Sequence, residues 1–191
     1  DVTQLAQEQR IISDEYSTTA SSLNSGSSFD LSFTIGNTST TTSTVTVATD
    51  TPAGVVSAIN AADIGITASL IDTGIAGANY RIVLSGENGS EAAFSVSSSP
   101  DLGFADVGNT LQSAQDAQLD YNGLTVTRSR NDIADLISGT TLSLNEVTSS
   151  AARLTVTSDQ STLKSGIENV VTVYNDFREI MDTLVKAPQE D

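Results

Sequence analysis

The amino-acid sequence of 191 residues contains no cysteine, no histidine and no tryptophan, and aromatic residues make up only 5% of it. The absence of cysteine excludes disulfide bonds, thiol catalysis and zinc–sulfur sites. The absence of histidine removes the commonest general base near neutral pH and the commonest metal ligand, so the usual catalytic triads are impossible. We therefore expect no catalytic residue and no cofactor.

Basic residues are scarce as well. Eight Lys and Arg residues stand against 24 Asp and Glu residues, which gives a net charge of −16. A negative field of this size repels nucleic-acid phosphates and anionic lipid headgroups. No apolar run approaches the about 18 residues of a membrane-spanning helix, so we expect neither nucleic acid nor membrane as a partner. The start at Asp1 rather than Met and the charged last residues predict a fragment of a longer protein.

Carboxylates are the chemistry that remains. Asp72, Glu87, Glu91 and Asp101 all fall in expected loops, where a solvated charge is the favoured interpretation. The calcium-loop spacing D-x-[DN]-x-[DN]-G is absent. The sequence DYNG at residues 120–123 matches a piece of that pattern, but it fits a hairpin turn better. We therefore predict no metal site.

Serine and threonine account for 27 and 25 residues, which favours strands and polar loops over helices. Alternating apolar and polar side chains predict strands at residues 29–35, 44–47, 66–70, 80–84 and 94–96. Between the second and third of these, Asp50 or Thr51 can cap a helix and Pro52 suits its first turn. One face of that helix would carry the apolar residues Val55, Val56, Ile59 and Ala62.

A second set of strands lies on both sides of this unit in the sequence. Residues 2–12 are predicted to form a strand that leads into a loop. Residues 117–121 and 124–128 alternate around Asn122-Gly123. That dipeptide is the strongest short hairpin signal, because both central residues of a type I′ turn need positive φ.

The region after this hairpin is harder to interpret. Residues 132–137 are predicted to form one helical turn that Gly139 closes. Leu142 and Leu144 would then form one strand of a further hairpin, with residues 154–156 as the other strand.

The last part of the chain has a heptad pattern. Apolar residues recur with the spacing 4-3-4-3-4-3 at Leu163, Ile167, Val170, Tyr174, Phe177, Met181 and Leu184. This is an a/d seam over three heptads, and a single helix cannot bury so narrow a stripe alone. We favour a coiled-coil helix that needs a partner helix over an amphipathic helix that lies on the β-strands.

Several segments resemble proteins of the bacterial flagellum. The flagellin hook IN motif of flagellar axial proteins is a helix with Ile-Asn-Ala followed by two strands. Residues 51–62 (TPAGVVSAINAA), 65–70 (GITASL) and 80–84 (YRIVL) resemble it. Further segments resemble the filament cap proteins, the FliD family or flagellar hook-associated protein 2, in the same order along the chain. They are residues 2–7 (VTQLAQ), 115–129 (QDAQLDYNGLTVTRS), 133–144 (IADLISGTTLSL) and 173–177 (VYNDF).

The resemblance implies a mainly β fold with some α (α+β). Two small antiparallel β domains would be present, with one inserted in the other. Residues 29–105 would form the outer head domain, residues 1–28 plus 106–158 the inner one, and residues 159–191 the start of a C-terminal coiled-coil stalk.

The resemblance also implies a function. Members of this family form an oligomeric cap at the filament tip and promote assembly of exported flagellin subunits. The implied partners are flagellin, hook–filament junction proteins and further copies of the chain, outside the cell on the flagellum. Some members bind host mucins, so an adhesin-type module that binds mucin or other glycans is an alternative. The variable region of another flagellar axial protein is a third.

Overall fold

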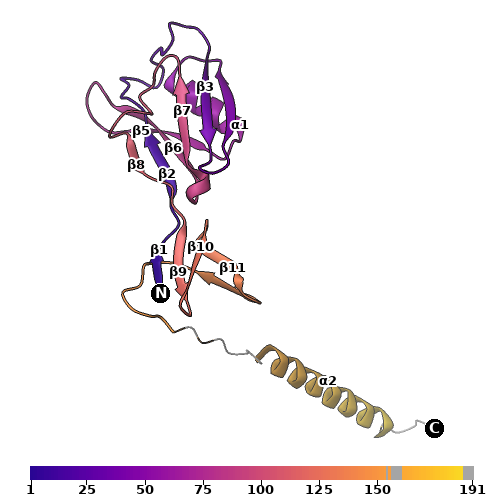
Figure 1. Ribbon diagram of the computed structural model, residues 1–191. Coiled ribbons are helices and arrows are strands. Elements are labelled where there is room, and N and C mark those ends of the chain that lie inside the picture. Colours follow the sequence, from indigo (N-terminus) through magenta and orange to yellow (C-terminus); the bar gives the residue numbers. More distant parts are fainter. Residues whose placement is uncertain (154, 156–160, 187–191) are drawn as a thin grey trace, which may run out of the picture. The chain divides into compact units, whose positions relative to one another are not determined.

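The computed structural model describes residues 1–153, 155 and 161–186 (Figure 1). The chain divides into two compact units, Asp1–Ala152 and Arg153–Asp191, and each is described by itself. The described elements, in chain order, are β1 (Val2–Gln4), β2 (Glu8–Ile12), β3 (Phe29–Ile35), β4 (Thr41–Val47), α1 (Pro52–Ala62), β5 (Thr67–Asp72), β6 (Tyr80–Asn88), the short 3-10 helix η1 (Ser90–Ala92), β7 (Phe94–Ser98), β8 (Thr110–Gln112), β9 (Ala117–Tyr121), β10 (Leu124–Arg128), β11 (Asp132–Ile137), β12 (Thr140–Ser143) and α2 (Ser161–Lys186). None of the described helices is long and apolar enough to cross a membrane.

The larger of two hydrophobic cores in the first unit lies between two antiparallel sheets and α1. The described strands of these sheets have the orders β4-β3-β7 and β5-β6-β2-β8. Alternation along β3 points Phe29, Leu31 and Phe33 into this core, and the polar residues between them lie on the other face of the sheet. The predicted strands of this region and their mainly antiparallel pairing are confirmed.

Helix α1 begins and ends where the sequence predicts. The Oγ1 atom of Thr51 accepts a hydrogen bond of 3.1 Å from the backbone N–H of Gly54, and Pro52 occupies the first turn. Asp63 adopts a left-handed conformation with φ of 48° and ends the helix. Val55 and Ile59 are fully buried in the larger core. Ala62, predicted on the same face, is exposed.

A smaller core lies between the sheet β1-β9-β10 and the hairpin β11–β12. Its buried residues are Ala6, Ala117, Leu119, Ile133 and Leu144. The hairpin between β9 and β10 turns at Asn122 and Gly123, whose φ angles are 54° and 82°. Both values are positive, which confirms the predicted turn.

The prediction of a helical turn at residues 132–137 is wrong, because this segment is strand β11 and pairs with β12. Its register shifts between Ile133 and Ile137. Extra residues in one strand break the period of two. The apolar residues of β11 therefore have a helix-like spacing. The hairpin predicted between Leu142 and Leu144 and residues 154–156 stays a prediction, because residues 154 and 156 lie outside the described part; the described partner of β12 is β11.

The boundary between the two cores also differs from the predicted domain boundaries at residues 28 and 106. Strand β2 lies between β6 and β8, and its Ile11 is part of the larger core. Leu102 and Phe104, near the end of the predicted outer domain, are buried in that core as well. The change from one core to the other therefore lies near Gln7 and Gln115, which form an isolated bridge. The division into two inserted domains itself stays a prediction.

Gly54, in the first turn of α1, allows a close approach that a larger residue would prevent. A Cβ atom at this position would lie against the carbonyl oxygen of Thr49, far inside van der Waals contact. We predict that Gly54→Ala lowers the free energy of unfolding by about 1–3 kcal/mol, although alanine is the better helix former. Gly166→Ala in α2 is the control, because a Cβ there meets nothing within 4 Å. The measurement is urea unfolding followed by circular dichroism. Equal stability of the two variants would contradict the prediction.

Candidate functional site

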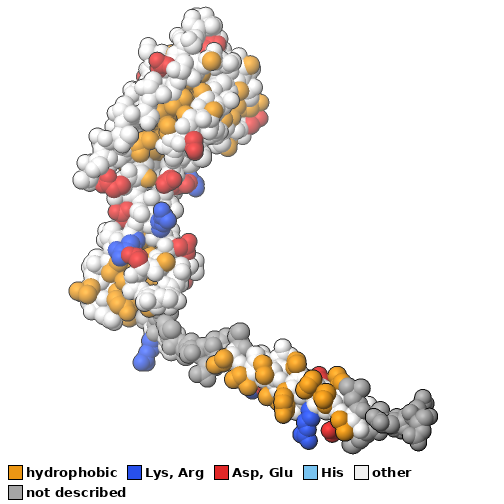
Figure 2. Space-filling model, turned by 90° about the vertical axis from the view of Figure 1, so that its right-hand side faces the viewer, with side chains coloured by type: hydrophobic (Ala, Val, Ile, Leu, Met, Phe, Trp, Pro, Cys, Tyr) orange, Lys and Arg blue, Asp and Glu red, His pale blue; other side chains and the backbone are white. Residues whose placement is uncertain are grey.

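The apolar face of α2 is the largest exposed hydrophobic feature of the described residues. The predicted seam residues in α2 are highly exposed, with 67% of Leu163, 64% of Tyr174 and 59% of Phe177 accessible. The other seam residues whose side chains are described are Ile167, Val170 and Met181, and all are exposed. Leu184 lies in the helix, but its side chain is outside the described part. Figure 2 shows the hydrophobic side chains in a row along this helix.

The apolar face is wider than the predicted seam. At about 100° per residue, Val171 and Val185 lie on one flank of the seam and Val173 and Ile180 on the other. All four are exposed. The apolar arc therefore covers about half of the helix circumference, which is more than a two-stranded a/d seam requires. Such a face can contact more than one neighbouring helix.

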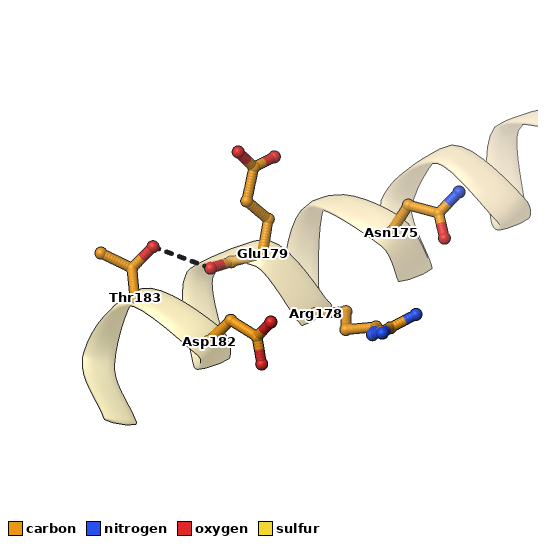
Figure 3. Close-up of a pocket in the computed structure, with 5 residues that line it drawn as sticks. All are labelled: Asn175, Arg178, Glu179, Asp182 and Thr183. Atoms are coloured by element: carbon orange, nitrogen blue, oxygen red, sulfur yellow. Dashed lines mark hydrogen bonds between the residues drawn. The ribbon is translucent and has the colours of Figure 1, made fainter. Parts of the chain in front are cut away.

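The remaining face of α2 is polar. Lys164 and Glu168 form an ion pair of 3.8 Å one turn apart. A hollow of about 430 Å³ is lined by Asn175, Arg178, Glu179, Asp182 and Thr183 (Figure 3). All five residues come from two turns of one helix. The hollow is therefore the space between neighbouring solvated side chains, and not a substrate site.

Asn60, the asparagine of the Ile-Asn-Ala motif, joins α1 to the sheet. Its Nδ2 donates a hydrogen bond of 2.9 Å to the carbonyl oxygen of Ala68, and its Oδ1 accepts one of 2.8 Å from the N–H of Ala68. Ala68 lies in β5, the edge strand of its sheet among the described strands. The amide of Asn60 thus takes the place of a neighbouring strand at this point.

Two other amide side chains make the same paired contact. Gln9 binds both the N–H and the carbonyl oxygen of Phe94 in β7, with both distances 2.8 Å. Asn131 binds both backbone groups of Ala6 at 2.8 and 3.0 Å. The sequence analysis missed these contacts because the partners lie 85 and 125 residues apart.

The carboxylates of Asp50 and Glu91 hold loops in place through hydrogen bonds. Oδ2 of Asp50 accepts hydrogen bonds from the Ser22 hydroxyl at 2.6 Å and from the N–H of Gly26 at 2.7 Å. The hydrogen bond from Ser22, followed by that from Gly26, lowers the pKa of Asp50. Glu91 holds the loop after β3 in the same way, and hydrogen bonds from Thr38 lower the pKa of its carboxyl group. Both groups are therefore ionised and engaged at neutral pH.

Four more carboxylates considered in the sequence are Asp72, Asp101, Asp120 and Glu87. Asp72 and Asp101 each accept the N–H two residues further on, from Gly74 at 2.8 Å and Gly103 at 3.0 Å. Asp120 accepts the N–H of Gly123 at 2.7 Å inside the hairpin turn. Glu87 lines a shallow hollow together with Glu91. Among the described residues, no group of three or more carboxylates could hold a metal ion.

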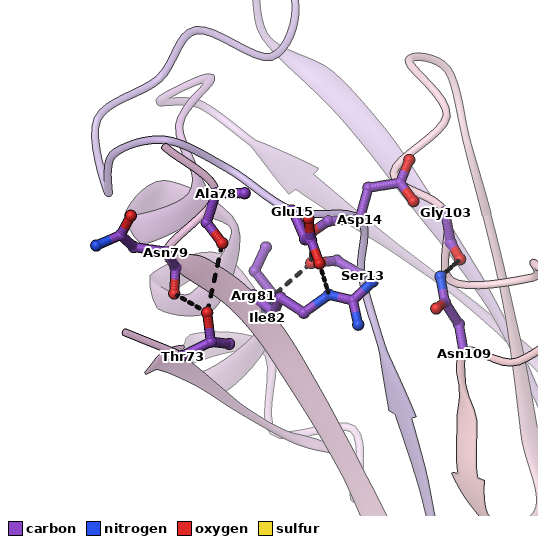
Figure 4. Close-up of polar contacts among 10 residues, drawn as sticks. All are labelled: Ser13, Asp14, Glu15, Thr73, Ala78, Asn79, Arg81, Ile82, Gly103 and Asn109. Atoms are coloured by element: carbon purple, nitrogen blue, oxygen red, sulfur yellow. Dashed lines mark hydrogen bonds and ion pairs between the residues drawn. The ribbon is translucent and has the colours of Figure 1, made fainter. Parts of the chain in front are cut away.

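The polar contacts inside the larger core have a structural role (Figure 4). The buried Ser13 hydroxyl accepts the N–H of Ile82 at 2.8 Å, and Asn109 donates to the carbonyl oxygen of Gly103 at 2.7 Å. Arg81 lies 3.9 Å from Glu15. Burial raises the pKa of the nearby Tyr16 hydroxyl, so this group is neutral. Ser13 and Asn109 thus satisfy backbone groups, and these residues form no nucleophile–base pair.

Loss of the Asn60 amide should destabilise the first unit. We predict that Asn60→Ala lowers the free energy of unfolding by about 1–3 kcal/mol, because the buried backbone groups of Ala68 lose their partner. Ser57→Ala, at an exposed position of the same helix, should change it by no more than about 0.5 kcal/mol. Denaturant unfolding of the two variants is the measurement. Similar losses in both would contradict this role of Asn60.

The loop bound by Asp50 should respond to acid. Because the folded-state pKa of Asp50 is lowered, its contribution to stability is complete above the ordinary aspartate pKa and is lost as the pH falls through the lower folded value. We predict that the amide protons of Asn24 and Gly26 stay protected from exchange until the pH has fallen below the ordinary pKa of an aspartate side chain. NMR titration is the measurement. Loss of protection at or above that ordinary pKa would contradict the prediction.

Comparison with known proteins gives consistent results. A family model described as flagellar hook-associated protein 2 C-terminus matches residues 114–191. The flagellar hook-associated protein 2 of Treponema pallidum is 46% identical over 67 residues, which are 35% of this chain and 9% of that protein. The Salmonella typhimurium protein of the same name is 29% identical over 140 residues, which are 68% of this chain and 29% of that protein. The chain therefore spans less than a third of these curated relatives.

Solved structures agree with this result. The flagellar cap protein FliD D1-D2-D3 domains from Escherichia coli superpose with a TM-score of 0.76 and 27% identity. The match covers 95% of this chain and 58% of that chain. The expected α+β fold class is confirmed by this likeness. Family model, curated relatives and structure together show that the chain is similar to flagellar hook-associated protein 2, the flagellar cap protein.

Proposed function

We propose that this chain is the head region and the start of the stalk of a structural cap protein, which forms an oligomeric cap at the tip of the flagellar filament. In this role it promotes the assembly of exported flagellin subunits outside the cell and contacts the hook–filament junction proteins. The proposal also holds that the chain is not an enzyme. The likeness to flagellar hook-associated protein 2 and to a flagellar cap protein supports this proposal.

The observation that carries this proposal is the exposed apolar arc of α2. Large apolar side chains that stay accessible along a whole helix indicate a site of protein association. The described carboxylates hold loops and turns, which leaves little chemistry for catalysis. The relatives and the solved structure above are named hook-associated protein 2 or cap protein, which favours the cap over a glycan-binding adhesin.

The apolar arc of α2 can be tested by a charge substitution. We predict that Phe177→Asp in the full-length protein weakens oligomer formation about 100-fold, because a buried unpaired charge costs about 3 kcal/mol or more. Ser165→Asp is the control, since Ser165 lies on the polar face of the same helix and the added charge is equal. Light scattering reports the oligomer mass, and the circular dichroism of the β-strands checks folding.

The cap function is tested in cells. A strain without its own cap protein is complemented with the wild-type protein, Phe177→Asp or Ser165→Asp. The expected result is normal filaments with the wild type and the control and few filaments with Phe177→Asp. Normal oligomers and filaments with Phe177→Asp would contradict the role of the α2 face. Filaments that form without any complementation, with only surface attachment lost, would contradict the cap function and favour an adhesin.

A further inference from the structure

Strand β4 forms a long edge of its sheet that carries no charge, no proline and no bulge, although α1 contacts the strand. It pairs with β3 through seven consecutive residue pairs from Thr41 to Val47, with no shift of register. Its sequence, TTSTVTV, contains no charge, no proline and no glycine. On its other side, no backbone hydrogen bond is formed to any described residue. Natural proteins usually protect such an edge with charges, proline, bulges or a covering segment.

Each of the other two long edges of the larger core is bound by an amide side chain at one residue. Asn60 binds both backbone groups of Ala68 in β5, and Gln9 binds both groups of Phe94 in β7. Strand β8, the remaining edge, is only three residues long. Among the described residues, no side chain makes such a paired contact with the backbone of β4.

We propose that the β4 edge pairs with the β4 edge of a second copy of the chain, antiparallel, around a two-fold axis at Thr44. In this register Thr44 lies opposite Thr44 of the second copy, Ser43 opposite Val45, and Thr42 opposite Thr46. In this register the core-facing side chains of β4 in both copies lie on the same side of the joined sheet. The exposed threonines form one continuous face on the other side. Facing threonines are a favourable cross-strand pair.

Charge is compatible with a second copy. Asp30 is the carboxylate next to β4 on the exposed face, and it accepts a hydrogen bond of 2.7 Å from Thr46. In the two-fold arrangement the Asp30 residues of the two copies are three strand spacings and four residues apart, or about 20 Å. This exceeds the screening length of about 8 Å at physiological ionic strength. The overall charge of −16 opposes pairing at low salt, so the dimer should become stronger as salt is added.

The interface is small, because it consists of one strand of seven residues from each copy. Interfaces at the low end of the size range are weak and transient. A cross-link is therefore the suitable probe, and the chain has no native cysteine that would interfere. The proposal needs neither the α2 face nor the cap function, so it can fail independently of them.

The test uses Thr44→Cys in the full chain under mild oxidation. Cα atoms of residues directly opposite each other across antiparallel strands are about 4.5–5.5 Å apart, which is within the range that a disulfide spans. Ser97→Cys in β7 is the matched control, because Thr44 and Ser97 lie on the two sides of Ser32 in the same row and both are exposed. We expect covalent dimers to form roughly tenfold faster, or more, with Thr44→Cys. Equal rates, or no dimer with either variant, would overturn the proposal.

Two further experiments test the register and the source of association. A mixture of Thr42→Cys and Thr46→Cys proteins should cross-link faster than either protein alone, because these positions face each other only in the proposed register. Thr44→Cys should still cross-link faster than Ser97→Cys when both proteins also carry Phe177→Asp, the substitution that weakens association through α2. Loss of the advantage in that background, or equal rates for the mixture and the separate proteins, would overturn the β4 pairing.

Discussion

The paired hydrogen bonds between amide side chains and the backbone of strand edges are the interaction on which this fold depends. Aromatic residues are few, so the buried apolar surface is limited, and the sheets need polar contacts at their borders. Asn60, Gln9 and Asn131 each satisfy an N–H and a carbonyl oxygen that would otherwise face no strand. Leaving such groups unpaired in the interior is costly. Two of these contacts lie on the edge strands β5 and β7, and the third satisfies Ala6 in the segment between β1 and β2.

The high acid content has a structural use as well. Asp50 and Glu91 hold loops through backbone N–H groups, and Asp72, Asp101 and Asp120 close turns. A carboxylate accepts several such bonds, and these charge-assisted bonds are stronger than neutral ones. A chain with much serine and threonine can in this way order long loops that contain few apolar anchors. The same charges make the surface strongly negative, so close association needs neutral or apolar contact areas.

Two such contact areas are present among the described residues. The apolar arc of α2 is an unpaired hydrophobic surface, and β4 is an uncharged strand edge. Association would be driven by different interactions at the two areas. Burial of apolar side chains would drive it at α2, and backbone hydrogen bonds would drive it at β4. Both areas suit contacts between protein chains, which agrees with the likeness to flagellar cap proteins.

Much of this protein could be predicted from local patterns in its sequence. Alternation placed β3 and β6, Thr51 and Pro52 placed the start of α1, Asn122-Gly123 placed a hairpin, and the heptad spacing placed α2. These signals are local because strand pleat, helix period and turn geometry are set within a few residues. For β11 the same rule failed, because an irregular register imitates a helical spacing.

Only the tertiary structure decided how these elements meet. The position of β2 between β6 and β8, the burial of Phe104, and the contact of Gln9 with Phe94 join residues far apart in the chain. An amide side chain has the same local signature on an exposed surface and at a strand edge. Which edge it covers, and that β4 has no such cover among the described residues, depends on long-range packing that no local pattern encodes.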